Sequence, residues 1–381
     1  MVTNVLLTGA SGFVGSNLLR YLLRKTEWSF VCPCSWKHKG IPERITRILT
    51  LNEGYKDRIQ VITHDLEAPF TATTIATMPR CSIFLNLAAD SHVDRSITDP
   101  VPFVQNNINS VLNVLELARL MKPDIFLQFS TDEVYGVAPE GINYAEWSAI
   151  VPSNPYSASK ASQEAIAISY WRTYNIPLII TQTMNVFGHG QDTEKFVPKI
   201  VQSVLLGQTL TIHGRRLESG AVESGSRFYI HADNVSDAIL FILNNVKPVL
   251  HNNGENNLPQ RLNIVGEREV DNWHLAHLVA EIFGMPVKYT LVDFHSARAG
   301  HDRRYALDGA KLASLGWKPP TNFYDSLVRT VRWYADNQAF LVGVSPSTPT
   351  APAKVSPCCF SSTSRFEEEE LPNERGYNFI D

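Results

Sequence analysis

Three glycines spaced three residues apart, Gly9, Gly12 and Gly15, follow a short apolar run and open a stretch with helical periodicity. In a strand–turn–helix unit, glycines at such positions permit a tight turn, let the backbone approach a pyrophosphate, and let helix and strand pack closely. The N-terminus of the helix then offers free N–H groups to the phosphates. Glycines also mark plain turns, but the place of this motif after the first predicted strand favours a dinucleotide site.

The first half of the chain alternates β-branched runs with helical stretches. We predict strands near residues 5–7, 30–31, 59–63, 82–87, 125–129 and 178–181, and helices near 14–24, 101–121 and 155–174. After about residue 185 the pattern is less regular, with helices at 196–206, 272–283 and 324–337 and extended runs at 209–213 and 262–265. Strands that alternate with helices imply a parallel sheet covered on both faces. The predicted fold class is α/β, a Rossmann-type doubly wound parallel sheet with a smaller α/β substrate-binding lobe.

We divide the chain into three parts. Residues 1–184 form the dinucleotide-binding domain with the catalytic residues, and residues 185–340 form mainly the substrate lobe, from which some elements return to the sheet. Residues 341–381 form a tail in which Ser, Thr and Pro are frequent and an acidic run follows. Such a composition buries too little apolar area to offset the entropy lost on ordering, so we predict a disordered tail.

Composition excludes several classes of protein. The net charge of −4 over 381 residues does not favour nucleic-acid binding, which requires a basic excess. No apolar run approaches the roughly 18 residues that a membrane span needs, and the N-terminus lacks the basic start of a signal peptide. The five cysteines fit no zinc-ligand spacing, so we expect no metal site, reduced thiols and a cytoplasmic location.

The cofactor site departs from the usual pattern at the adenosine end. An Asp or Glu about 20 residues after the glycine motif normally holds the ribose. Here the second predicted strand runs into Cys34, Ser35 and Lys37, and the acid is absent. Ser35, Lys37 and Lys39 would then face a 2′-phosphate, or the lysines belong to a solvated loop, so NADP is an alternative to NAD. Asp65, after the third strand, is placed to touch adenine or to cap the strand end.

Tyr156 and Lys160 form a Y-x-x-x-K motif at the start of a predicted helix, where a spacing of four places both on one face. A tyrosine normally titrates near pH 10, and a neighbouring ammonium together with a positive nicotinamide would lower that pKa. The phenol then serves as a base toward a hydroxyl whose carbon gives up hydride. The alternative is an exposed pair on an ordinary helix.

Three consecutive polar residues, Thr131, Asp132 and Glu133, follow the fifth predicted strand. Ligands of open parallel sheets bind at the carboxyl ends of the strands. Thr131 is placed to hydrogen-bond a sugar hydroxyl, and the two carboxyls can act as acid and base if their environments separate their pKa values. The alternative is an acidic loop that caps the next turn.

These motifs, together with the stretches 87–97, 154–160, 185–188 and 300–306, resemble the extended short-chain dehydrogenase/reductase family. Within it the chain is most similar to the dTDP-glucose 4,6-dehydratases, over about residues 3–338. The Thr-Asp-Glu triplet and the late Gly-His-Asp-Arg-Arg-Tyr stretch mark the dehydratase branch. The resemblance implies a nucleotide-sugar 4,6-dehydratase that turns an NDP-hexose, expected to be dTDP-glucose, into its 4-keto-6-deoxy form with bound NAD.

The resemblance also implies roles. Tyr156 would take the O4 proton as hydride leaves C4, Glu133 would remove the C5 proton, and Asp132 would protonate the departing C6 hydroxyl. The catalytic residues are Thr131, Asp132, Glu133, Tyr156 and Lys160. The cofactor contacts are Gly9, Ser11, Gly12, Phe13, Val14, Gly15, Ser35, Lys37, Asp65, Leu66, Leu87, Ala88, Ala89, Tyr156 and Lys160. The substrate contacts are Ser91, Thr131, Asn185, Lys195, Phe196, Arg227, Asn263, Arg298 and His301.

Some features keep alternatives open. Arg227 is followed by Phe228 where the family usually has Asp, and the loop from Gly214 to Arg227 is longer than usual, which leaves the nucleotide base undecided. An epimerase or decarboxylase of the same fold and a non-catalytic NAD(P) or sugar-nucleotide sensor are the competing functions. The family is usually dimeric, and helices 101–121 and 155–174 would form the contact of a homodimer.

Overall fold

The computed structural model describes residues 3–37, 39–251, 257–293 and 303–342. The predictions for Arg298, His301 and the tail from residue 343 lie outside the described residues. Helix α13 (Ala339–Val342) covers the last described positions, two of which the sequence analysis assigned to the tail.

Seven parallel strands form the main sheet, in the order β11-β6-β5-β4-β1-β2-β3. The strands are β1 (Asn4–Thr8), β2 (Ser29–Cys34), β3 (Ile59–Thr63), β4 (Ile83–Asn86), β5 (Ile125–Thr131), β6 (Leu178–Thr183) and β11 (Gln260–Ile264). The order reverses between β1 and β4, and ligands of doubly wound sheets bind in the crevice that such a reversal creates.

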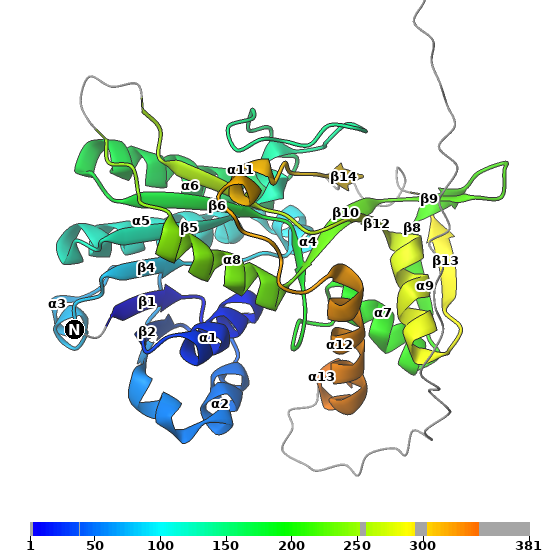
Figure 1. Ribbon diagram of the computed structural model, residues 1–381, viewed down its shortest axis with the longest axis horizontal. Helices are drawn as coiled ribbons and strands as arrows, with labels where there is room; N and C mark the ends of the chain where they lie inside the picture. Colours follow the sequence, from blue (N-terminus) through cyan, green and yellow to red (C-terminus); the bar gives the residue numbers. More distant parts are fainter. Residues whose placement is uncertain (1–2, 38, 252–256, 294–302, 343–381) are drawn as a thin grey trace, which may run out of the picture. The chain divides into compact units, whose positions relative to one another are not determined.

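Helices cover both faces of this sheet (Figure 1). One face packs on α1 (Phe13–Lys25), α2 (Pro42–Leu51) and α8 (Ala232–Asn245), and the other on α5 (Pro100–Met121) and α6 (Pro155–Tyr174). Neighbouring residues of one strand divide between the two cores, because successive side chains of a strand point to opposite faces. In β1, for example, Val5 and Leu7 enter the first core and Leu6 enters the second. The doubly wound α/β prediction is confirmed.

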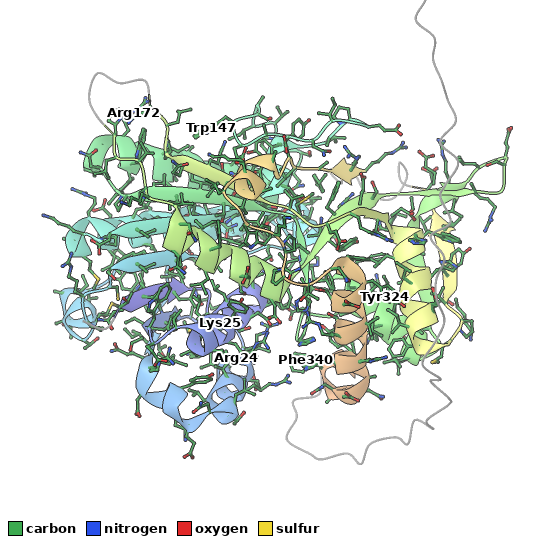
Figure 2. All side chains as sticks on the ribbon, in the orientation of Figure 1. Arg24, Lys25, Trp147, Arg172, Tyr324 and Phe340 are labelled. Atoms are coloured by element: carbon green, nitrogen blue, oxygen red, sulfur yellow. The ribbon has the colours of Figure 1, made fainter. Side chains whose placement is uncertain are left out.

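Helix α1 illustrates how local sequence shapes these elements. It begins directly after Gly12, and its last turn carries the basic residues Arg24 and Lys25, which Figure 2 labels. Positive side chains there complement the negative end of the helix dipole. Leu18, Leu19 and Leu22 are fully buried against the sheet. None of the described helices is both long and apolar enough to cross a membrane.

The second lobe is built on smaller sheets. Strand β10 (Ser226–His231) pairs with β7 (Asn185–Phe187), β12 (Glu269–Asp271) and β14 (Arg304–Tyr305). Strand β8 (Thr209–Arg216) pairs with β9 (Val222–Ser224) and β13 (Lys288–Val292). Helices α7 (Phe196–Leu205), α9 (Asn272–Phe283) and α12 (Phe323–Asp336) share the apolar core of this lobe.

Several elements join the two parts. Strand β11 adds to the main sheet beside β6, and α8 packs on α1, although both follow the start of the lobe in sequence. The short helices α3 (Ala72–Ala76), α4 (Val93–Thr98) and α11 (Ala310–Ser314) lie in connecting segments. Helices α2 and α8 were not predicted, and β2 is longer than the two residues expected, since burial of Cys32 and Cys34 continues the strand.

Candidate active site

A cavity of about 360 Å³ opens at the carboxyl ends of β1 to β6. Its volume falls in the usual range of small-molecule sites. The predicted residues that line it are Gly9, Ser11, Gly12, Phe13, Val14, Gly15, Ser35, Lys37, Asp65, Leu66, Leu87, Ala88, Ala89, Ser91, Thr131, Asp132, Glu133, Tyr156, Lys160, Asn185, Lys195 and Phe196. The fold thus brings these residues into one site, and their roles toward cofactor and substrate stay predictions.

The glycine motif forms a cradle at one side of the cavity. Gly9 has a φ of +73°, a conformation that side chains disfavour. A Cβ on Gly15 would lie 2.1 Å from the carbonyl oxygen of Gly9, so only glycine fits there. Gly12 caps α1 without any side-chain hydrogen bond, which leaves the first N–H groups of the helix to an anion. The cradle therefore fits the pyrophosphate of a dinucleotide.

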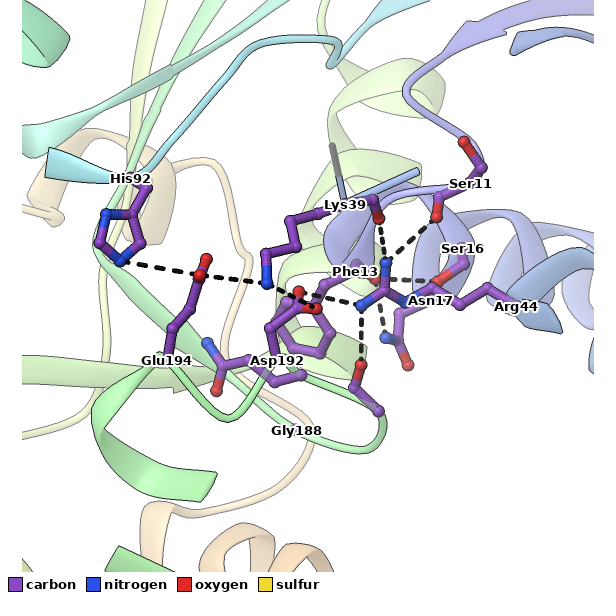
Figure 3. Close-up of polar contacts among 12 residues, drawn as sticks. Ser11, Phe13, Ser16, Asn17, Lys39, Arg44, His92, Gly188, Asp192 and Glu194 are labelled. Carbon is purple, nitrogen blue, oxygen red and sulfur yellow. Dashed lines mark hydrogen bonds and ion pairs between the residues drawn. The ribbon is translucent and has the colours of Figure 1, made fainter. Parts of the chain in front are cut away.

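Arg44 of α2 closes this cradle from the outside. Its guanidinium donates hydrogen bonds to the carbonyl oxygens of Ser11 and Gly190, both at 3.2 Å, and to the carboxylate of Asp192 at 3.0 Å. Figure 3 shows Arg44 between the glycine loop and the segment that leads to α7. This buried arginine holds the glycine loop against the second lobe, and neither it nor Asp192 was predicted as a site residue.

The acidic pair sits where β5 ends and a short 3-10 helix (Asp132–Tyr135) begins. The Thr131 hydroxyl donates to Oδ1 of Asp132 at 3.0 Å and accepts from the backbone N–H of Glu133 at 3.3 Å. Asp132 is buried, and its other carboxylate oxygen has no hydrogen-bond partner among the described residues. Burial, and then the charge of Glu133, raise the pKa of Asp132 to about 7.

Glu133 has a different environment from Asp132. It is half-buried, and its Oε2 accepts a hydrogen bond from the hydroxyl of Tyr305 at 3.3 Å. Tyr305 comes from β14, in the late stretch that carried part of the family resemblance, but sequence reasoning assigned it no role. The two carboxyls thus lie in different environments, one enclosed and the other solvated and hydrogen-bonded. Such a difference separates their pKa values, so one can act as an acid and the other as a base.

Tyr156 and Lys160 enter from the first turns of α6. Asn154 and Ser157 form a capping box at the start of this helix, and Ser96 accepts a hydrogen bond from the backbone of Tyr156 at 3.1 Å. Burial leaves only 8% of Tyr156 and 3% of Lys160 exposed. The helix start is therefore firmly held, which fixes both side chains at the cavity wall.

The protein's own groups shift the pKa of Tyr156 upward, whereas the predicted lowering also counted the charge of a bound nicotinamide. Burial, with the charges of Glu133 and Asp132, raises the pKa of Tyr156, although the Thr131 hydroxyl opposes the shift. Lys160 does not lower it, because burial reduces the pKa of Lys160 itself to about 7. The Lys160 ammonium also donates to the carbonyl of Phe129 at 2.8 Å and to Gln163 at 2.6 Å. The charge that would favour a phenolate is therefore not supplied by Lys160 alone.

A buried chain of amides links Lys160 to the strand that precedes the glycine motif. Gln163 Oε1 accepts from Gln128, whose own Oε1 accepts from Asn86 at 2.8 Å. Asn86 in turn accepts from the Thr8 hydroxyl at 2.7 Å. Because partners in such a buried network orient one another, the network fixes the position of Lys160 relative to the glycine loop.

Among the described residues, two that were predicted to contact the substrate lie outside this cavity. Asn263 was expected to contact the diphosphate or base, but it is fully buried in β11 and donates to the carbonyls of Tyr144 at 3.0 Å and Asp308 at 2.9 Å. Its amide N–H groups are thus used to hold loops, and the substrate assignment is corrected. Arg227 donates to the carbonyl of Arg303 at 2.6 Å and lies over the Tyr305 ring at 4.5 Å, near the acidic pair.

At the rim, Lys195 donates to the carbonyl of Ser91 at 3.0 Å, which joins the two lobes across the cavity. Cavity residues that were not predicted as site residues include Asp90, His92, Arg95, Asn106, Gln191, Asp192, Glu194 and Tyr229. The sequence could have indicated Asp192 and Glu194 as site residues, because they lie between the predicted substrate contacts Asn185 and Lys195.

Several known proteins resemble this chain in sequence and in fold. The family model described as GDP-mannose 4,6 dehydratase matches residues 6–330. A dTDP-glucose 4,6-dehydratase of Streptomyces antibioticus is 32% identical over 363 residues, covering 92% of this chain and 98% of the relative. Among solved structures, DesIV, a dTDP-glucose 4,6-dehydratase of Streptomyces venezuelae with NAD and TYD bound, has a TM-score of 0.76 and 29% identity over 89% of this chain and 98% of its own. A UDP-glucose 4-epimerase of Thermus thermophilus with NAD has a TM-score of 0.73 and 25% identity over 87% of this chain and 99% of its own.

Proposed function

Because this chain belongs to the GDP-mannose 4,6-dehydratase family, we propose that it converts an NDP-hexose, with dTDP-glucose as the first candidate, into the NDP-4-keto-6-deoxyhexose. The observation that carries the proposal is the Asp132–Glu133 pair beside Tyr156 in one cavity. An epimerase needs only to move hydride at one carbon, whereas elimination of water needs an acid and a base as well. The acidic pair supports the dehydratase over the epimerase.

NAD is the cofactor that we assign. The related dehydratase of S. venezuelae was solved with NAD, and the glycine cradle here has the open helix N-terminus that its pyrophosphate needs. Gly9, Gly12 and Gly15 would hold the phosphates, and Asp65 and Lys37 lie at the adenosine end of the cavity. A bound NAD would supply the hydride acceptor for C4 of the sugar and the hydride donor for C6.

The side chains supply the proton transfers. Tyr156, ionised to the phenolate once the positive nicotinamide adds its charge to that of Lys160, would take the proton of the C4 hydroxyl, which Thr131 hydrogen-bonds. The C4 ketone then acidifies the hydrogen on C5. Glu133, the solvated carboxylate, removes that C5 proton. Asp132, protonated because it is buried, gives its proton to the C6 hydroxyl, and water leaves. Glu133 afterwards returns its proton to C5 and is restored. Asp132 must then regain a proton and Tyr156 must lose one, by exchange with solvent, before the next cycle.

This assignment predicts how the rate depends on pH. Because Asp132 must be protonated and its pKa is about 7, its protonated fraction falls as pH rises through that value. We expect kcat/KM of the wild type to decline above about pH 7, since this parameter reports the free enzyme. Asp132→Asn should lower kcat/KM by about a hundredfold and flatten this limb. An alkaline limb of the same position and slope in the variant would show that Asp132 is not its source.

The function itself is tested on the full chain with a panel of dTDP-, UDP-, GDP- and CDP-hexoses, followed by mass spectrometry. Loss of one water from one sugar nucleotide, without net consumption of cofactor, supports the proposal and names the base. An isomer of unchanged mass and new retention time would support the epimerase, and unchanged substrates throughout would contradict both. We also propose that the protein forms a homodimer through α5 and α6 and is located in the cytoplasm.

A further inference from the structure

Gln163 provides the side-chain acceptor that holds Lys160. The Lys160 ammonium donates to Oε1 of Gln163 at 2.6 Å and to the backbone carbonyl of Phe129 at 2.8 Å. Gln163 follows Lys160 by three residues on α6 and is fully buried. An ammonium has three N–H groups, so these two acceptors leave one of them for the cavity that Lys160 lines. The Y-x-x-x-K motif ends at Lys160, and the structure adds the residue three positions further on.

Two neighbours fix the direction in which the Gln163 amide points. Its Nε2 donates to the backbone carbonyl of Asn107 at 2.7 Å, and its Oε1 accepts from Nε2 of Gln128 at 3.3 Å. Asn107 is itself held, because its side chain accepts from the backbone N–H of Asp90 at 2.7 Å and donates to the carbonyl of the same residue at 3.1 Å. A reversed amide would leave the Asn107 carbonyl without its donor and would place N–H groups against the ammonium. Oε1 therefore faces Lys160.

The far end of the amide chain is fixed in the same way. The Thr8 hydroxyl accepts from the two backbone N–H groups that follow β4, both at 3.1 Å, so its own hydrogen goes to Asn86. Asn86 then donates to Gln128 at 2.8 Å, and Gln128 donates to Gln163. The direction of the whole chain is thus set from both ends, and hydrogen bonds aligned in this way strengthen one another.

Lys160 needs such an acceptor because burial works against its charge. Only 3% of the residue is exposed, and burial alone lowers its pKa to about 7. The titratable side chains that line the cavity from α6 itself, or from the elements packed against it, are Tyr156, Asp132, Glu133 and Arg95. A hydrogen bond to the charged form of a group favours that form. The Gln163 carbonyl oxygen therefore offsets part of the penalty that burial imposes on the ammonium.

We propose that Gln163 is a positioning residue for the catalytic pair, because its fixed carbonyl oxygen holds the Lys160 ammonium charged and at the cavity wall. With the ammonium in place, its charge adds to that of a bound nicotinamide and favours the Tyr156 phenolate. Without Gln163 the buried lysine would be largely neutral at pH 7, and this effect would be lost. The proposal rests on the proposed function only for the role of Tyr156 as a base.

The test reads the charge of Lys160 directly in the full chain. The protein is labelled with carbon-13 at the lysine ε carbon, the Lys160 signal is assigned by its loss in Lys160→Met, and its chemical shift is followed as the pH changes. We expect the wild-type signal to titrate near pH 7. Gln163→Met should lower the midpoint by about one pH unit or more, the tenfold effect of losing one charge-assisted hydrogen bond. In Gln163→Glu, which keeps an acceptor oxygen, the midpoint should equal or exceed that of wild type.

Gln182→Met is the matched control. It removes a fully buried amide from β6 that donates to Glu164 at 3.1 Å and does not line the cavity, so the Lys160 midpoint should stay at the wild-type value. An unchanged midpoint in Gln163→Met, an equal shift in Gln182→Met, or a lowered midpoint in Gln163→Glu would each overturn the proposal. Gln163→Leu replaces Gln163→Met in the test if the latter fails to fold.

A second measurement follows cofactor reduction in a single turnover. Gln163→Met should slow it by about fivefold at pH 7, the change in the charged fraction of Lys160 that a one-unit shift gives, and the loss should shrink as the pH falls. Reduction at the wild-type rate, despite a shifted midpoint, would remove Gln163 from this role. Because the titration needs neither sugar nor cofactor, failure of the dehydratase assay leaves its result independent.

Discussion

Glu133→Gln is expected to stop water loss while oxidation at C4 continues. The amide cannot accept the C5 proton, so formation of the 4-keto-6-deoxy product should fall by about a thousandfold, within the usual contribution of a general base. Tyr156 and Lys160 are unaltered, so the hydride taken from C4 should accumulate as reduced nicotinamide. The measurement follows near-ultraviolet absorbance and product mass in the same single-turnover reaction.

Two further readouts sharpen this prediction. In heavy water, wild type should introduce deuterium at C5 of the product, and Glu133→Gln should not exchange C5 of the bound sugar. Glu140→Gln, an exposed acid in the loop that follows, is the matched control and should behave as wild type. If Glu133→Gln still released product at more than a tenth of the wild-type rate, another group would have to be the base.

Tyr156→Phe should fail one step earlier. Phenylalanine lacks the oxygen that we assign as acceptor of the O4 proton, so we expect both product formation and cofactor reduction to fall by about a thousandfold. The fold should survive, because the capping box and the backbone bond to Ser96 do not involve the phenol oxygen. The same single-turnover absorbance trace measures the effect, with thermal unfolding as the check on folding.

The contrast between the two variants is the informative result. Glu133→Gln should accumulate reduced nicotinamide and Tyr156→Phe should not, which orders the two chemical steps. Tyr170→Phe is the matched control, since it lies on the same helix but its hydroxyl contacts Glu116 outside the cavity. Wild-type cofactor reduction in Tyr156→Phe would remove the tyrosine from its assigned role.

Much of the sheet domain could be predicted from sequence. Helix α6 and strand β3 have the predicted bounds, and α1 and α5 differ from prediction by at most one residue at either end. In a helix the pattern depends on residues three and four positions apart, and in a strand on residues two positions apart. Each pattern can therefore be recognised without the rest of the chain. The second lobe was harder, because its short strands pair with partners distant in sequence, as β10 does with β7 and β14.

The candidate active site was likewise predictable only in part. Many of the residues that line the cavity could be predicted from motifs at strand ends, because parallel strands bring their carboxyl ends to one edge. The contacts of those residues could not be predicted from the sequence. Asn263 turns to the loop carbonyls of Tyr144 and Asp308, and the Tyr156 phenol meets acidic neighbours instead of a free ammonium.

By itself, therefore, the sequence determined the α/β fold class, the glycine cradle and the residue types at the catalytic edge. Each of these depends on short-range spacing or on one residue's own backbone freedom, such as Gly9 with its positive φ. Only the tertiary structure decided the partners of Lys37, Arg44 and Glu133, which lie 28, 148 and 172 residues away in Asp65, Asp192 and Tyr305. Charge state and burial depend on such long-range contacts, because packing sets which atoms replace water around an ionisable group.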